Sequence, residues 1–127
     1  MAAADAHPST GLFAPKILDF ERRTVLDNVG HWLYADGLSR GRGRLEVDRG
    51  QYDAEAEIGL ASGCAVLLRR AMLAGVGLFD EDLFAYCDTD LGARARLAGW
   101  SCRAVPSAVV YRKYSAASAA LRSRRSW

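Results

Sequence analysis

Five carboxylates crowd into eleven residues of the second half of the chain: Asp80, Glu81, Asp82, Asp88 and Asp90. Large apolar side chains stand between or beside them: Phe79, Leu83, Phe84 and Tyr86. Apolar walls exclude water and so strengthen each charge interaction. An ionised carboxylate that faces a substrate hydroxyl is suited to act as a general base. The segment therefore indicates a candidate site for proton abstraction; the alternative is that the acids only cap a helix.

Asp88 stands where a helix is expected to begin. Apolar residues recur at helical spacing through Asp88–Gly99, and Gly99 is a typical stop signal. Asp88 or Thr89 is expected to be the N-cap, and the positive end of the helix dipole would keep the Asp88 carboxylate ionised. The helix would thus present a carboxylate from its first turn.

Strands and one more helix are expected around this segment. The strands are Lys16–Phe20, Thr24–Val29, Cys102–Val105 and Ala108–Tyr111. Ile58–Leu68 is expected to be a buried strand interrupted at Ser62-Gly63, followed by a short helix at Arg69–Gly75. Gly37–Gly50 holds four glycines and is expected to be a surface loop. Mixed strands and helices favour an α/β or α+β arrangement.

The composition is that of an ordinary globular protein. Of the 127 residues, 50% are apolar and 25% are charged, which fits one small domain or a piece of a larger one. The three cysteines, Cys64, Cys87 and Cys102, show no CxxC pairing, which argues against a disulfide framework and a zinc site. Each is expected to be a small buried side chain. The two histidines, His7 and His31, are expected in ordinary surface or half-buried roles.

Charge divides the chain into two unequal parts. Residues 1–90 hold 9 Lys/Arg and all 15 Asp/Glu, a net −6, whereas residues 91–127 hold 8 Lys/Arg and no acid, a net +8. We assign residues 1–114 to one structural unit and residues 115–127 to a basic tail rich in Ala, Ser and Arg. Such asymmetry is typical of a tail that meets an anionic surface. The alternative is a solvated basic end.

The sequence also bears on localisation and on nucleic acid. No apolar run approaches the roughly 20 residues needed to span a bilayer, and the first residues lack a basic region followed by an apolar stretch. We expect a cytoplasmic protein, with a further hypothesis of peripheral contact at the inner face of the cell membrane through Arg112–Arg125. The RGRGR run at Arg40–Arg44 lacks interleaved aromatic residues, so a nucleic-acid partner is not expected.

A series of different short motifs follows a defined order along nearly the whole chain, up to the basic tail. Around the carboxylates they are Gly77, Phe79-Asp80-Glu81, Phe84, Tyr86, Asp88-Thr89-Asp90-Leu91, Arg94 and Gly99-Trp100. Elsewhere they are Ala14–Leu18, Asp27 with Gly30, Arg40-Gly41, Gly50–Asp53, Ser62-Gly63, Arg69-Arg70, Val105-Pro106 and Ala108–Tyr111. Their order and spacing resemble the acceptor side of bacterial family 2 glycosyltransferases, in particular the rhamnosyltransferase-like group.

The resemblance implies a fold and a reaction. The fold would be α/β and partially GT-A-like, the fold of nucleotide-diphospho-sugar transferases, with a mixed sheet, flanking helices and the N-terminal nucleotide-binding βαβ half missing. The reaction would transfer a sugar from a nucleotide-diphospho-sugar to a saccharide or lipid-linked acceptor, with inversion. A divalent metal, Mg or Mn, would neutralise the diphosphate leaving group. The implied process is polysaccharide biosynthesis for the cell envelope.

The resemblance also implies roles for individual residues. Asp88 would take the proton from the acceptor hydroxyl, and Asp90 would support the helix start or the acceptor. Ser62 and Gly63 would form a floor where the sugar approaches the backbone. The remaining substrate-binding candidates are Phe79, Asp80, Glu81, Tyr86 and Arg40, the last in a loop that could touch a diphosphate.

Two positions depart from the family pattern. Phe79–Leu91 is one residue short, so Cys87 stands directly before Asp88 where the family has a glutamate. Arg112 stands where the family has a histidine that helps to hold the metal, and a guanidinium cannot ligate a cation. We therefore expect poor metal binding and weak or no activity from this chain alone. The alternative is a non-catalytic remnant or acceptor-binding module of a split enzyme, with a partner chain supplying the donor half.

Overall fold

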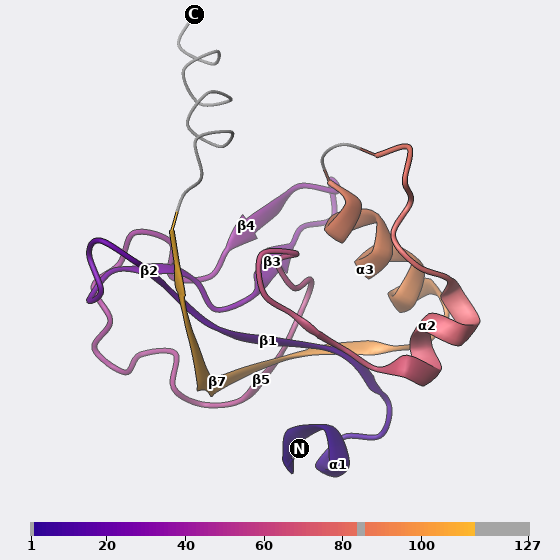
Figure 1. The fold of residues 1–127 in the computed structure, drawn as a ribbon, viewed down its shortest axis with the longest axis horizontal. Helices are drawn as coiled ribbons and strands as arrows, with labels where there is room; N and C mark the ends of the chain where they lie inside the picture. The colour runs from indigo at the N-terminus through magenta and orange to yellow at the C-terminus, as the bar shows by residue number, and fades with distance from the viewer. Residues whose placement is uncertain (1, 84–85, 114–127) are drawn as a thin grey trace, which may run out of the picture.

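The structure, a computed structural model, describes residues 2–83 and 86–113 (Figure 1). Its α/β arrangement combines a curled mixed sheet, a second small sheet and short helices. The elements in chain order are α1 (Ala2–Ala6), β1 (Thr10–Asp19), β2 (Leu26–Asn28), β3 (His31–Leu33), β4 (Ser39–Gly41), β5 (Ala56–Ile58), β6 (Leu67–Leu68), α2 (Arg70–Val76), α3 (Cys87–Leu97) and β7 (Ser101–Arg112). The predictions for Phe84 and for the tail lie outside the described residues.

The larger sheet is built around β1 and β7, which run parallel to each other. Its strand order is β2-β1-β7-β5, and β6 also pairs with β1. The pairs of β1 with β2 and β6, and of β5 with β7, are antiparallel. Residues 10–18 of β1 are all buried, as is typical of a strand covered on both faces. The predicted mixed sheet with flanking helices is confirmed, whereas the likeness to GT-A stays a prediction.

Strand β7 is bent. Pro15 pairs with Val105 but Lys16 pairs with Val109, so β7 bulges over the three residues 106–108. Figure 1 shows the sharp turn of β7 that results. Pro106 fits such a bulge because proline has no N–H to donate to a sheet. The two strands predicted for this stretch are therefore one bent strand.

The helices α2 and α3 lie in the connection from β6 to β7, and both were predicted to within two residues. Their buried side chains are Met72, Leu91 and Ala95. A Cβ added to Gly92 would lie 2.5 Å from Leu60 Cδ2, so α3 approaches the segment after β5 closely. The core continues over the sheet with Leu12, Ala14, Leu18, Leu26, Val29, Ile58 and Cys102. None of the helices in the described part is long and apolar enough to span a bilayer.

The prediction that Gly37–Gly50 is only a surface loop is wrong. The segment contains β4, which pairs with β3 in the separate antiparallel sheet. It also contains Arg42, which is only 6% exposed. Arg42 is buried because the rings of Trp32 and Tyr52 flank its guanidinium. That arrangement is tertiary, so the glycine content of the segment could not reveal it.

The prediction of one interrupted strand over Ile58–Leu68 is also wrong. β5 ends at Ile58 and pairs with β7, whereas β6 pairs with β1. Ser62-Gly63 lies in the connection that passes from one strand to the other. Cys64 lies in the same connection and is exposed, and Cys87 is only partly buried, so the expectation that every cysteine is buried fails for both. Cys102 is buried on β7 as expected.

We predict that Ile17→Ala lowers the free energy of unfolding by about 2–5 kcal/mol, because it leaves a cavity at the centre of the sheet. Ile17 is 0% exposed on β1. The matched control is Leu97→Ala, since Leu97 is 90% exposed at the end of α3. Its effect should stay within about 0.5 kcal/mol. Urea unfolding followed by circular dichroism measures both, and equal losses would contradict the assignment of β1 to the core.

Candidate functional site

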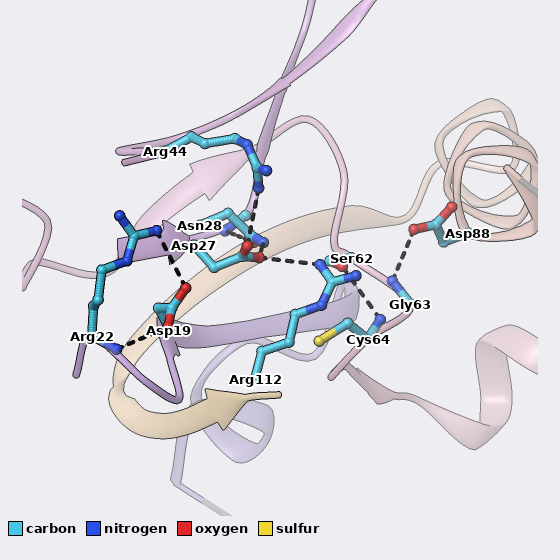
Figure 2. Close-up of polar contacts among 11 residues, drawn as sticks. Asp19, Arg22, Asp27, Asn28, Arg44, Ser62, Gly63, Cys64, Asp88 and Arg112 are labelled. Carbon is cyan, nitrogen blue, oxygen red and sulfur yellow. Dashed lines mark hydrogen bonds and ion pairs between the residues drawn. The ribbon is translucent and has the colours of Figure 1, made fainter. Parts of the chain in front are cut away.

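The Asp88 carboxylate is held between the first turn of α3 and the connection from β5 to β6. The Gly63 N–H donates to Asp88 Oδ2 at 2.9 Å, as Figure 2 shows. The Thr89 N–H donates to Asp88 Oδ1, also at 2.9 Å. The contact with Gly63 joins residues 25 positions apart in the sequence, and the two contacts together fix the direction of the carboxylate. The structure thus brings together two of the predicted site residues, Asp88 and Gly63; their predicted roles as base and as sugar-binding floor stay predictions.

The start of α3 differs from the prediction. The helix begins at Cys87, and Tyr86 is the N-cap, with a left-handed backbone at φ 63° and no side-chain capping bond. Neither Asp88 nor Thr89 is the N-cap, so that prediction is wrong. Because the left-handed turn starts the helix earlier, Asp88 lies inside the first turn. Its carboxylate is therefore directed to the Gly63 N–H of the neighbouring connection.

Gly63 permits this contact because it has no side chain. A Cβ added there would lie 3.1 Å from Asp88 Cβ, tighter than ordinary van der Waals contact. The preceding Ser62 is 92% buried, and its hydroxyl accepts from the Cys64 N–H at 3.3 Å. Ser62 and Gly63 therefore form a compact turn directly beside the carboxylate.

A buried carboxylate forms the second part of the site. Asp27 on β2 is 3% exposed. Its oxygens accept from Asn28 Nδ2 at 2.8 Å, from Arg44 at 3.0 Å and from Arg112 at 3.3 Å (Figure 2). A carboxylate that leaves water needs such partners, because an isolated buried charge is very costly. Asp27 therefore fixes the end of β7 and the segment after β4 to the same point.

His31 at the start of β3 connects the two carboxylates electrostatically. Its pKa is lowered, mainly by burial, while the negative charges of Asp88 and Asp27 act in the opposite direction. A histidine with an ordinary pKa near 6.5 becomes more strongly neutral at pH 7 when its pKa falls. Burial therefore favours the neutral form of the His31 imidazole in the candidate site.

The other predicted site residues have different environments. Asp90 pairs with Arg94 at 3.0 Å, and Arg94 also donates to the carbonyls of Val76 and Leu78. These contacts of Arg94 fix the segment that follows α2 to the helix α3. Asp80 accepts from the Asp82 N–H at 3.0 Å and so forms a local turn in that exposed segment. Four further candidates are exposed: Phe79, Glu81, Tyr86 and Arg40.

The described residues do not form a metal site. Within residues 2–83 and 86–113, no group of three or more His, Cys, Asp or Glu side chains is arranged so that it could hold a metal ion. Asp27 faces two guanidinium groups and Asp90 faces one. The expected Mg or Mn therefore has no fitting ligand set in this part of the chain.

Sequence reasoning missed the functional environment of Asp27, His31, Arg44 and Arg112. Arg112 was interpreted only as a group that repels a metal, and His31 only as an ordinary half-buried residue. One signal was present: Asp27 is a single acid in the apolar run TVLDNV of a predicted strand. A charge at such a position is buried only with a partner, which is a reason to search for arginines elsewhere in the chain.

Comparison with known proteins shows that part of the chain is similar to a glycosyltransferase. A segment of 58 residues is 47% identical to N-acetylglucosaminyl-diphospho-decaprenol L-rhamnosyltransferase of Mycobacterium tuberculosis, in both strain CDC 1551 / Oshkosh and strain ATCC 25618 / H37Rv. Nearly half of this chain is thus similar to a glycosyltransferase. The match covers 45% of this chain and 19% of the length of each relative. No known family profile matches the chain, and no solved structure matches it significantly.

We predict that Arg112→Met lowers the free energy of unfolding by about 1–3 kcal/mol, because Asp27 stays buried while it loses a cation. Adding Asp27→Asn should recover part of this loss, and chemical denaturation of the single and double variants measures the coupling. The control Arg22→Met removes only an exposed pair with Asp19, which contributes about 0–1 kcal/mol. If the losses of unfolding free energy caused by Arg112→Met and Asp27→Asn simply add in the double variant, the two residues do not form a buried ion pair.

We predict that His31 makes the fold less stable as the pH falls from 7.5 towards 5.5. The unfolded chain binds a proton at His31 near its ordinary pKa of about 6.5, whereas the folded chain binds it only at lower pH. The unfolded state therefore holds more protons in this window, so its free energy falls relative to that of the folded state as the pH is lowered. His31→Gln should flatten this dependence in urea titrations at several pH values. His7→Gln is the control, and an equal flattening there would contradict the assignment to His31.

Proposed function

We propose that this chain is the acceptor-side part of a glycosyltransferase in which Asp88 is the general base. The observation that carries the proposal is the Asp88 carboxylate held against the Gly63 N–H at 2.9 Å. One main-chain hydrogen bond to each oxygen, from Gly63 and from Thr89, orients the carboxylate while leaving further lone pairs able to accept a proton. The similarity of the chain to a rhamnosyltransferase supplies the reaction class.

The proposed reaction is an inverting displacement. The oxygen of an acceptor hydroxyl attacks the anomeric carbon of a nucleotide-diphospho-sugar and forms the new glycosidic bond. The bond from that carbon to the diphosphate breaks, and its electron pair leaves with the nucleoside diphosphate. The hydroxyl proton passes to Asp88, whose position on α3 lets it act as the base. Attack opposite to the leaving group accounts for inversion.

The proposed substrates follow from the relatives. Their name specifies an L-rhamnosyl group and an N-acetylglucosaminyl-diphospho-decaprenol. We infer that this chain serves transfer of a related sugar to a saccharide on a lipid-linked diphosphate, within a GT-A-like, family 2 framework. Such a reaction would belong to cell-envelope polysaccharide synthesis at the cytoplasmic face of the membrane. Phe79, Glu81 and Tyr86 would line the approach of the acceptor.

A metal held by this chain is not part of the proposal. Mg²⁺ or Mn²⁺ would neutralise the developing charge on a diphosphate, but Asp27 and Asp90 are already paired with arginines. No step of the proposed reaction therefore passes through an ion held by the described residues. The second candidate function is an acceptor-binding module that works with a partner chain.

We predict that the 127-residue chain alone transfers little or no sugar, and that a fragment of the mycobacterial relative lacking the matched segment restores transfer when mixed with it. In the mixture Asp88→Asn should lower kcat by about 10²–10⁴-fold, with a smaller change in KM for the acceptor. Radiolabelled nucleotide sugars and a lipid-linked saccharide measure the transfer.

Glu21→Gln is the matched control, because Glu21 is an exposed acid in the turn between β1 and β2 and lies outside the proposed site. It should leave kcat unchanged. Unchanged transfer by Asp88→Asn would contradict the role of Asp88 as base. Substantial sugar transfer by the chain alone would contradict the need for a partner. The role of Asp88 would then be tested by measuring Asp88→Asn in the chain alone.

A further inference from the structure

A cavity of about 450 Å³ opens over the small sheet of β3 and β4. Its principal side chains are Trp32, Tyr34, Tyr52, Arg40, Arg44 and Glu46. Three aromatic rings, two guanidinium groups and one carboxylate therefore share one concave surface. Ligand sites typically combine such aromatic walls with a few polar groups that fix the orientation of the ligand.

The aromatic rings at this cavity are unusually accessible. Trp32 is 44% exposed and Tyr34 is 47% exposed, although tryptophan is normally well buried. Trp32 stands opposite Arg40 in the β3–β4 register, so the ring and the arginine belong to neighbouring strands at the same level. Exposed aromatic residues gathered in one place mark an interaction surface rather than scattered surface residues.

Arg42 makes this aromatic surface rigid. Its guanidinium carbon lies 4.9 Å from the Trp32 ring centroid and 5.1 Å from the Tyr52 ring centroid. The side chain is buried and donates to the Val29 carbonyl at 2.8 Å. Among the described residues its Nε has no hydrogen-bond partner, which is a cost in free energy. The cation–π contacts with both rings offset part of that cost and hold the rings in place.

Glycine at position 43 is necessary for this packing. Gly43 has φ +74°, and an added Cβ would lie 2.7 Å from Tyr52 Cε2. The Tyr52 ring therefore lies directly against the backbone. This contact gives a reason for the alternation of glycine and arginine in RGRGR: one glycine admits the ring, while the arginines around it supply charge to the core and to the cavity.

The polar groups of the cavity suit hydroxyl groups. Glu46 accepts from the Tyr52 hydroxyl at 2.8 Å, which orients its carboxylate at the cavity wall. Arg40 and Arg44 are donors only, whereas the carboxylate is an acceptor only. A sugar hydroxyl is both donor and acceptor and can satisfy both kinds of group. A fully ionised phosphate could accept from the two guanidinium groups but has no hydrogen to donate to Glu46, whereas a saccharide offers both and so matches the whole set.

The cavity is connected to the candidate site. Arg44 lines the cavity and also donates to the buried Asp27 at 3.0 Å. His31, the residue before Trp32, exchanges main-chain hydrogen bonds with Leu60, three residues before Gly63, whose N–H donates to Asp88. A chain of sugar units with one end at Asp88 could therefore continue along β3 towards the aromatic surface.

We propose that this cavity is a saccharide subsite, with Trp32 and Tyr34 stacking on a sugar ring and Arg40, Arg44 and Glu46 binding its hydroxyls. It takes the unit of the acceptor beyond the one that carries the attacking hydroxyl. The assignment of this unit rests on the proposed transferase function. Binding of a saccharide to the cavity can be tested without any transfer reaction.

The test titrates the 127-residue chain with neutral disaccharides that contain N-acetylglucosamine or L-rhamnose, and follows the Trp32 indole N–H resonance by NMR. Saturable binding is expected. Trp32→Ala should weaken it at least tenfold and Trp32→Phe by less, because phenylalanine keeps a stacking face. Tyr34→Ala gives a second variant that does not disturb the contact of Arg42 with Trp32. Tyr111→Ala is the control, since Tyr111 is exposed to a similar degree outside the cavity.

Asp88→Asn separates this inference from the proposed function, because it should lower kcat for transfer in the mixture with the mycobacterial fragment and leave disaccharide binding by the chain unchanged. Parallel titrations use uridine diphosphate, inorganic pyrophosphate and single-stranded oligouridylate. Absence of disaccharide binding, or binding that Trp32→Ala does not weaken, would overturn the subsite. Binding of a nucleotide, pyrophosphate or oligonucleotide that depends on Trp32, without disaccharide binding, would overturn the assignment to saccharide.

Discussion

The parallel pairing of β1 with β7 is the constraint on which the remaining structure depends. It joins Thr10 to Ser101 and Asp19 to Arg112, residues about ninety positions apart. Parallel strands need a long crossover, and here that connection contains both the small sheet and the helix α3. The register also brings Arg112 to the end of β1 where β2 begins. The ion pair of Arg112 with Asp27 therefore depends on this strand pairing.

Burial of Asp27 makes this arrangement specific. A carboxylate in the sheet is stable only where Arg44 and Arg112 reach it, and each arginine comes from a different element. The alternative packings that separate these elements would leave a buried charge without compensation. The ion pairs of Asp27 with Arg44 and Arg112 thus favour one relative position for the end of β7 and the segment after β4. That segment also forms the wall of the aromatic cavity, so the two sites share a structural origin.

The sequence predicted the local elements better than their tertiary relations. The helix α3 and the strand around Lys16 followed from the local sequence pattern, whereas the contact of Gly63 with Asp88 was not predicted. The burial of Arg42 was not predictable, because it depends on two rings, Trp32 and Tyr52, that come from separate segments. The left-handed Tyr86 was equally inaccessible, since non-glycine residues rarely adopt that conformation. Local patterns report periodicity, whereas buried charges and unusual turns depend on the whole fold.

The hydrogen bond from Gly63 to Asp88 has a consequence for divergence within this group of proteins. The donor is a main-chain amide, so the orientation of the carboxylate does not depend on the chemical identity of any neighbouring side chain. Substitutions around the turn can accumulate while an N–H remains at the same place. Only the glycine itself is constrained, by the space that Asp88 occupies. A related chain can therefore retain the same carboxylate geometry after most of the surrounding residues have been substituted.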